Sequence, residues 1–371
     1  MKINIDTYCL KWKIADYICS ILYYSGVINS IIFLRRAVFK KYRLIILAYH
    51  KVINPEYGGL NLNVSPDKFE KQIIYLVKHY NIVSLNRIVE YIKTQKIVKD
   101  LVAITFDDGY KDNYTNAFPI LKKYRIPATI FLSTGFIDTG NLPWWEKLSQ
   151  AVRTILKEEI NVKLSEAIYP LRIRKVLADL FSMRDKNSYK RLASLISLLS
   201  EISEERRNTI ITALLATIST SKRNGLNIYK MLSWKEINEM KDNNISFGCH
   251  TVSHRDLTKI QPIQIKEEIL HSKVLIEEKI NKPVVFFAYP YGEKKYFNDR
   301  VIKILKENGF LCACTKINGT NEDCDDLFYL RRNGIMDFSI SVFSARLEGL
   351  FELKFVRYLA NKFFLKKRLS I

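Results

Sequence analysis

Short apolar runs alternate with amphipathic stretches along most of the chain. Six of these runs are five or six residues long and almost wholly apolar, which is typical of strands in a parallel sheet covered on both faces. They lie at residues 44–49, 101–106, 128–133, 245–250, 284–289 and 311–315. The amphipathic stretches predict helices, one of them following Ser65 with Pro66 in its first turn and another over residues 263–280. Alternating strands and helices predict a barrel or a doubly wound sheet.

One long block interrupts this alternation. Residues 143–231 contain almost no glycine and no strand-like run, but they show several helical periods. We interpret the block as a helical insertion in a barrel loop, with a separate small helical domain as the alternative. The chain then consists of an N-terminal helical extension (1–43), a barrel (44–335) that carries the insertion, and a C-terminal extension (336–371).

Composition and charge narrow the possible partners. The chain has 371 residues and a net charge of +21. It is 48% hydrophobic and 12% aromatic, which excludes a disordered or low-complexity protein. Such a charge suits nucleic acid, a membrane surface or an anionic glycan. About half of the excess lies in residues 1–48 and 346–371, which are also rich in apolar and aromatic side chains. Solvated basic tails lack these side chains, so we expect a membrane surface and no nucleic acid.

The N-terminal extension contains an uncharged segment, residues 17–34, followed by five basic residues up to Arg43. As a helix it would span roughly 27 Å, slightly less than the hydrocarbon core of a bilayer. An interfacial helix is our first interpretation, and a transmembrane span and an ordinary docked helix are the alternatives. The basic, aromatic run 351–371 could lie on the same surface or dock on the core. We therefore expect a peripheral membrane protein, and either side of the membrane is consistent with the sequence.

Two clusters of candidate catalytic and metal-binding residues follow predicted strands. Asp107 and Asp108 come directly after the run 101–106, and His250 and His254 lie at and after the end of the run 245–250. Active sites of parallel α/β folds gather at the carboxyl ends of strands. One of two adjacent carboxylates can bind a metal while the other accepts a proton. Asp108, His250 and His254 would form a set that suits zinc, and also iron, cobalt or manganese.

Simpler readings of these clusters remain open: adjacent aspartates often cap helices or turns, and loop histidines are often only hydrogen-bonded. Two further strand ends add to the same edge. Tyr291 lies in a Tyr-Pro-Tyr-Gly corner that can offer a backbone N–H, and His50 follows the first strand, where it could act as an acid.

The ordered motifs TFDDGY (105–110), HTVSH (250–254) and AYPYG (288–292) resemble the polysaccharide deacetylase family, which is carbohydrate esterase family four or the NodB homology family. The likeness covers residues 44–335, and AYHKV (48–52) resembles the poly-N-acetylglucosamine deacetylase branch. The resemblance implies a distorted (β/α) barrel of about seven strands. It also implies metal-dependent removal of acetyl groups from N-acetylated amino sugars in a polysaccharide or lipid-linked glycan.

Residue by residue, the resemblance assigns Asp107 as the general base. It assigns a divalent metal, most simply zinc, to Asp108, His250 and His254. The Tyr291 N–H would contact the oxyanion. The chain departs from the family twice. Ala288 stands where an arginine often orients the base, so we expect Arg331 or Arg332 to replace it in space. No histidine follows His271, which leaves His50 as the expected acid.

Three other functions remain as alternatives. An O-acetyl esterase or a hydrolase of another C–N bond would use the same residues. A non-catalytic glycan-binding or membrane-associated barrel would explain the two departures from the family pattern. The complete set of Asp107, Asp108, His250 and His254 favours an enzyme, because a site without catalytic work to do would be expected to lose ligands.

Overall fold

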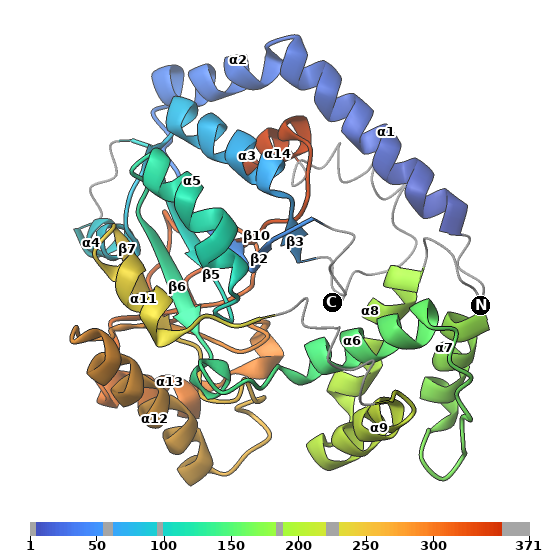
Figure 1. The fold of residues 1–371 in the computed structure, drawn as a ribbon. Coiled ribbons are helices and arrows are strands. Elements are labelled where there is room, and N and C mark those ends of the chain that lie inside the picture. The colour runs from blue at the N-terminus through green and yellow to red at the C-terminus, as the bar shows by residue number, and fades with distance from the viewer. Residues whose placement is uncertain (1–4, 55–61, 95–98, 183–187, 220–229, 351–371) are drawn as a thin grey trace.

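The computed structural model describes residues 5–54, 62–94, 99–182, 188–219 and 230–350 (Figure 1). Its centre is a curled sheet with the strand order β10-β1-β5-β6-β7-β8-β9, in which β4 pairs with the first part of β5. All strand pairs in this sheet are parallel. The strands are β1 (Leu44–Tyr49), β4 (Asn81–Ile82), β5 (Leu101–Phe106), β6 (Ala128–Leu132), β7 (Ile245–Cys249), β8 (Phe286–Ala288), β9 (Cys312–Cys314) and β10 (Asn333–Gly334). The predicted distorted (β/α) barrel is confirmed.

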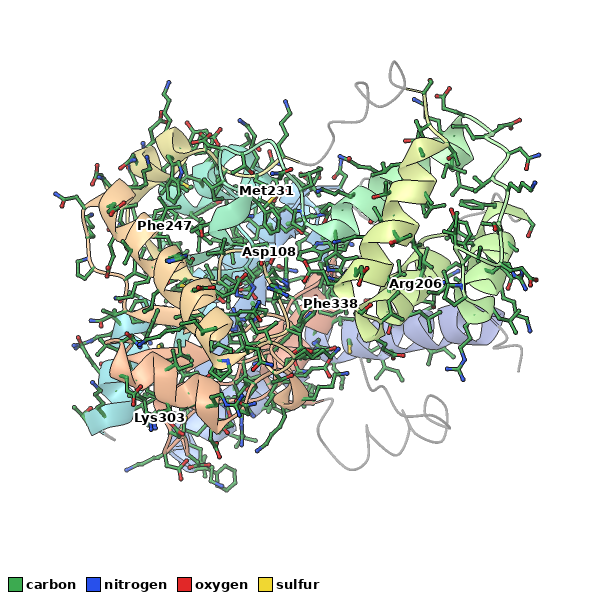
Figure 2. All side chains as sticks on the ribbon, turned by 90° about the horizontal axis from the view of Figure 1, so that it is seen from below. Asp108, Arg206, Met231, Phe247, Lys303 and Phe338 are labelled. Carbon is green, nitrogen blue, oxygen red and sulfur yellow. The ribbon has the colours of Figure 1, made fainter. Side chains whose placement is uncertain are left out.

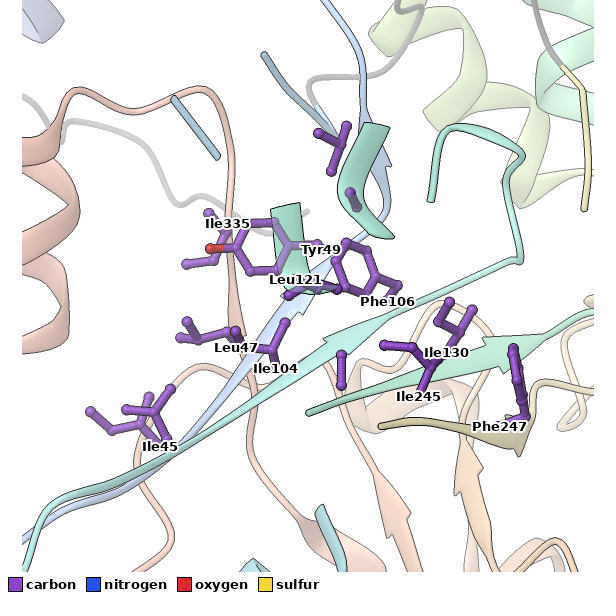
Figure 3. Packing of buried hydrophobic residues seen from close by; sticks show 14 of the residues in the cluster. Ile45, Leu47, Tyr49, Ile104, Phe106, Leu121, Ile130, Ile245, Phe247 and Ile335 are labelled. Carbon is purple, nitrogen blue, oxygen red and sulfur yellow. The ribbon is translucent and has the colours of Figure 1, made fainter. Parts of the chain in front are cut away.

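Both faces of the sheet are buried, as the apolar runs predicted. β1 and β5 pair in register from Leu44 with Leu101 to Tyr49 with Phe106, and all twelve of these residues are buried. Alternate side chains point to opposite faces of a strand. One set packs against the surrounding helices. It includes Ile45, Leu47, Tyr49, Ile104 and Phe106, which are labelled in Figure 3. The other set forms a second cluster that includes Leu44, Ile46, Leu101, Ala103, Cys312 and Cys314.

The segment Leu330–Gly334 joins the two ends of the sheet. Leu330 bridges to Cys314 of β9, and its N–H donates to the Ala313 carbonyl at 3.1 Å. Three residues later, Asn333 and Gly334 form β10 and pair with β1. Arg332 lies inside this joining segment and is fully buried. The barrel therefore closes at the segment that carries this arginine.

Helices surround the sheet in the order that the pattern predicted. They are α3 (Pro66–His79), α4 (Leu85–Thr94), α5 (Phe118–Lys123), α11 (Trp234–Lys241), α12 (Pro262–Ile280) and α13 (Asp299–Glu307). The two helices that the sequence analysis named begin near their expected positions, with Ser65 as the N-cap of α3 and Pro262 in the first turn of α12. A short parallel pair, β2 (Lys51–Val52) and β3 (Asn63–Val64), follows β1.

The predicted insertion is helical. Its described helices are α6 (Trp144–Lys157), α7 (Leu171–Ser182), α8 (Ser188–Glu201) and α9 (Glu204–Ala216). They enclose a hydrophobic cluster of their own, built around residues such as Leu148, Leu177 and Leu214. The insertion lies beside the barrel (Figure 1), and the first turn of α6 reaches the carboxyl ends of the strands. A contact between the insertion and the site follows from this placement.

The N-terminal extension forms a bent pair of helices rather than one straight helix. α1 (Ile5–Tyr24) and α2 (Val27–Phe33) are separated at Gly26, which has φ 79°, and a π-helical turn, η1 (Leu34–Val38), continues α2. α1 packs against α14 (Ile340–Leu347). Among the described residues no single helix is long and apolar enough to cross a bilayer. The pair Lys13–Tyr24 and Val27–Val38, which is bent by 64°, has the length and the composition of a possible span. Residues 351–371, for which the sequence suggested a surface helix, lie outside the described residues.

Candidate active site

The residues that the sequence singled out meet at one edge of the sheet. They come directly after, or within five residues of, the ends of four strands: His50 after β1, Asp107 and Asp108 after β5, His250 and His254 after β7, and Tyr291 after β8. Figure 2 labels Asp108 near the middle of the molecule in that view, and Asp108 is 3% exposed. All but Tyr291 are buried, and Tyr291 is half-buried.

Two tight turns hold this arrangement. Asp108 and Gly109 have φ values of 72° and 82°, and Tyr291 and Gly292 have values of 61° and 67°. The left-handed conformation costs a residue other than glycine about 1–3 kcal/mol, and residues strained in this way are found most often at functional sites. Glycine is required at 292 for a second reason, since a Cβ there would lie 2.6 Å from the backbone nitrogen of Lys316. The glycines thus let the chain reverse directly beside Asp108 and Tyr291.

Asp108, His250 and His254 converge as a three-ligand set. The Nε2 atoms of His250 and His254 lie 3.5 and 3.6 Å from Oδ1 of Asp108. One ligand atom from each residue lies within 4.8 Å of the others. Nδ1 of His250 lies 2.7 Å from the carbonyl oxygen of Ala288. Because that carbonyl only accepts, the proton sits on Nδ1 and the lone pair of Nε2 is free to coordinate.

This set fits a divalent cation on electrostatic grounds. Oδ1 of Asp108 is buried and has no hydrogen-bond partner among the described residues. Burial, reinforced by the charges of Asp107 and Glu146, raises the pKa of Asp108 to about 8. Burial also lowers the pKa of both histidines, so they present neutral rings. A buried carboxylate without donors that faces two imidazole lone pairs is stabilised by a cation, and this donor set suits zinc, iron, cobalt or manganese.

Asp107 is held by an arginine from the segment that closes the barrel. Nη1 and Nη2 of Arg332 donate to the two carboxylate oxygens of Asp107 at 2.7 and 2.8 Å, and Nε of Arg332 donates to the Thr315 carbonyl at 2.8 Å. Burial alone would raise the pKa of Asp107, but the charge of Arg332 outweighs it and holds the pKa well below its usual range. Asp107 is therefore an oriented, ionised carboxylate next to the candidate metal-ligand set.

Of the two arginines proposed to replace the one missing at Ala288, the structure selects Arg332. Arg331 is exposed and its side chain lies against Gly319. Ala288 is fully buried, and its carbonyl is used by His250. The guanidinium thus approaches Asp107 from the segment directly before β10, whereas position 288 lies on β8.

His50 also lies beside Asp107, with Nε2 3.9 Å from Oδ2 of the carboxylate. Burial lowers the pKa of His50 to about 3, and the charge of Lys316 adds to the effect. His50 is therefore neutral at ordinary pH. To act as an acid it must first receive a proton, and Asp107 is the nearest carboxylate that could supply one.

Tyr291 lies at the same site through its side chain, and its backbone N–H is a candidate donor there. No hydrogen-bond acceptor for this N–H is found within the part of the chain that the structure describes. Its ring lies 4.8 Å from the His254 ring, centre to centre, and its hydroxyl accepts a bond from Trp144 at 3.4 Å. The position suits a donor to an oxyanion.

The sequence analysis missed two groups. The first is Lys316, which follows β9 and is half-buried. Its charge interacts with Asp107, Asp108 and His50. Burial lowers its pKa, and the two aspartates oppose that shift. Only the curl of the sheet brings the end of β9 to this site, so no local signal marked Lys316.

The second is a buried network that links α6 to the barrel. Nζ of Lys51 lies 2.5 Å from Oε1 of Glu146, which also accepts the hydroxyl of Tyr110 at 2.9 Å. That hydroxyl accepts Nε1–H of Trp145 at 2.9 Å, and the Trp145 ring lies 4.7 Å from the ring of His254. The insertion therefore packs against His254, one of the three candidate metal ligands. The Trp-Trp-Glu sequence that opens α6 was visible, but its partners were not.

A family model described as "Polysaccharide deacetylase" matches residues 94–164 and 206–313. The two matched segments contain Asp107, Asp108, His250, His254 and Tyr291, and the unmatched residues between them fall within the helical insertion.

Two curated relatives align with the chain. A poly-beta-1,6-N-acetyl-D-glucosamine N-deacetylase of Staphylococcus aureus is 39% identical over 107 residues, which is 29% of this chain and only 36% of the relative. A putative polysaccharide deacetylase of Bacillus subtilis, YxkH, is 22% identical over 314 residues, covering 84% of this chain and 78% of the relative.

Solved structures show the same fold. The deacetylase PplD of Streptococcus pyogenes, determined with acetate, superposes with a TM-score of 0.52 at 22% identity, over 79% of this chain and 92% of that one. IcaB from Ammonifex degensii gives a TM-score of 0.53 at 18% identity, over 83% and 97%. The match to the family model, supported by the curated relatives, shows that the chain belongs to the polysaccharide deacetylase family.

Proposed function

We propose that the protein is a metal-dependent hydrolase that removes acetyl groups from N-acetylated amino sugars in a polysaccharide or lipid-linked glycan. One observation carries the proposal: an ionised carboxylate, Asp107, is fixed by Arg332 directly beside the buried set Asp108, His250 and His254. The names of the staphylococcal relatives favour an N-acetylglucosamine polymer as the substrate.

An amide resists hydrolysis because its carbonyl is a weak electrophile and its amine leaves poorly. A divalent metal, zinc in our proposal, would be held by Asp108, His250 and His254, where it would supply acidification of a water molecule and polarisation of the acetyl carbonyl. Asp107 accepts the proton of the attacking water, and Arg332 keeps the carboxylate in place for the transfer. The Tyr291 N–H donates to the oxygen on which negative charge develops.

Breaking the C–N bond requires a proton on the departing nitrogen. Asp107 holds the proton taken from water, and His50 Nε2 lies 3.9 Å from the Oδ2 atom of that carboxylate. We propose that His50 accepts this proton and passes it to the nitrogen. The products are acetate and a free amino sugar, and Asp107 returns to its ionised form.

Acetate release provides the test. The metal-stripped protein, with and without added zinc, should be incubated with oligomers of β-1,6-linked and β-1,4-linked N-acetylglucosamine. We expect zinc-dependent release of acetate. Asp107→Asn should abolish turnover and leave the bound-metal content unchanged. Asp242→Asn, at an exposed aspartate, is the matched control and should behave as wild type. Full activity in Asp107→Asn would remove this residue from the base role.

An O-acetyl ester is the second candidate substrate, and the neutral resting state of His50 favours it. An alkoxide leaving group needs less help from an acid than an amine does. His50→Ala should therefore slow hydrolysis of the N-acetyl substrate more than that of an O-acetylated sugar. Equal losses on the two substrates would argue against proton donation by His50.

A further inference from the structure

The N-terminal arm, which we define as residues 13–41, is fixed to the body of the protein by its inner face. The inner side chains of Cys19, Ile28 and Ile32 are buried in the main core. Arg35 binds Asp100 through two hydrogen bonds at 2.7 and 2.6 Å, and Nε of Arg36 lies 2.5 Å from the same carboxylate. The orientation of the arm is therefore set by packing and by buried ion pairs.

The outer face of the arm is also apolar. Sixteen large hydrophobic residues are exposed over the described side chains, and ten of them lie on this arm. The ten are Ile14, Tyr17, Ile18, Ile21, Tyr24, Val27, Phe33, Leu34, Val38 and Phe39. Those on α1 recur at intervals of three and four residues, which places them on one face of the helix. A surface helix of a monomeric protein normally presents polar side chains to water, so this concentration indicates an interaction surface.

The charges on the arm are almost all positive. Lys13, Lys40 and Lys41 are exposed at its two ends, and Asp16, the one acidic residue of the segment, is half-buried and bonded by Ser339. Asp100 and Glu348 together balance the charges of Arg35 and Arg36, so these two arginines add no net positive charge to the arm. The exposed lysines therefore select a partner that is apolar with an anionic surface.

We propose that the outer face of the N-terminal arm binds the surface of an anionic lipid bilayer, with its apolar side chains in the boundary between headgroups and acyl chains. Amphipathic helices with lysines and aromatic residues bind in this way. The 64° bend and the docked inner face oppose a transmembrane orientation. A second copy seated on the same face would bring its own lysines against these, and like charges would oppose that dimer.

Sedimentation with lipid vesicles tests the proposal on the full-length chain. Vesicles of phosphatidylcholine mixed with phosphatidylglycerol should bind the protein, and those of phosphatidylcholine alone should bind it less. Added salt should weaken binding to the mixed vesicles. Ile21→Glu and Phe33→Glu should each lower the partition coefficient by about tenfold, because each removes an apolar side chain from the lipid contact.

Ile263→Glu is the matched control, since Ile263 on α12 is exposed to 65%, as is Phe33. It should bind vesicles like wild type, and thermal unfolding should show that all three variants are folded. Unchanged vesicle binding by the Ile21→Glu, Phe33→Glu double variant would overturn the proposal. It would also be overturned if wild type were a dimer without lipid and this variant a monomer, because a second copy would then occupy the face.

Discussion

Removing the charge of Arg332 should reveal how strongly the closing segment of the barrel depends on Asp107. Arg332→Met deletes two charge-assisted bonds to Asp107, one bond to Thr105 at 3.1 Å and one to the Thr315 carbonyl at 2.8 Å. The carboxylate is then left buried without a counter-charge. Breaking a buried pair in this way lowers the free energy of unfolding by about 3–5 kcal/mol.

A double-mutant cycle isolates the pair. Asp107→Asn combined with Arg332→Met removes both charges, so the double variant should be more stable than the sum of the two single losses predicts. We expect a coupling free energy of about 3 kcal/mol. Urea denaturation of metal-free protein measures it, and Arg331→Met, at the exposed neighbour, is the control. Losses that simply add would refute the inference that Arg332 compensates Asp107.

A conservative variant separates stability from catalysis. Arg332→Lys keeps a positive charge but loses the two parallel bonds that orient the carboxylate. Metal content should be unchanged, whereas kcat should fall by about 100-fold, as for a misplaced catalytic group. Unaltered kcat in this variant would show that charge alone, without bidentate geometry, prepares Asp107.

Two further predictions concern the residues that the sequence did not reveal. Lys316→Met should raise the pKa of His50, because it removes a positive neighbour that disfavours the imidazolium. NMR titration of the metal-free protein measures this pKa, and an unchanged value would contradict the electrostatic link between the two residues. Lys51→Met should lower the free energy of unfolding by about 3–5 kcal/mol, and adding Glu146→Gln should restore part of the loss. If the double variant were less stable than Lys51→Met, the inference that Lys51 stabilises the fold by pairing with the buried charge of Glu146 would be wrong.

Most elements of the barrel could be predicted from the chain alone because their signal is local. Apolar runs of five or six residues located β1, β5, β6, β7, β8 and β9, and each lies within or close to its predicted range. The two-residue strands β4 and β10 were missed, since their pairing comes from neighbours in space rather than from their own composition. The uncharged segment 17–34 was expected as one helix, but Gly26 divides it.

The sequence by itself determined which side chains lie at the carboxyl ends of the strands. Position after a parallel strand is a local property, so Asp107, Asp108, His250 and His254 could be placed at one edge of the sheet without coordinates. The distances between them, and so the fit to a cation, required the folded chain.

Only the tertiary structure decided how Asp107 is held and what surrounds it. Barrel closure brings Arg332, 225 residues further along the chain, to the carboxylate of Asp107. The same curl brings Lys316 to the site, and the insertion contributes Glu146 and Trp145. These contacts join segments that are far apart along the chain, and no periodicity or motif spacing in the sequence marks them. They are stabilised in part by charge pairing, because a cation beside a buried, ionised carboxylate offsets the cost of removing that carboxylate from water.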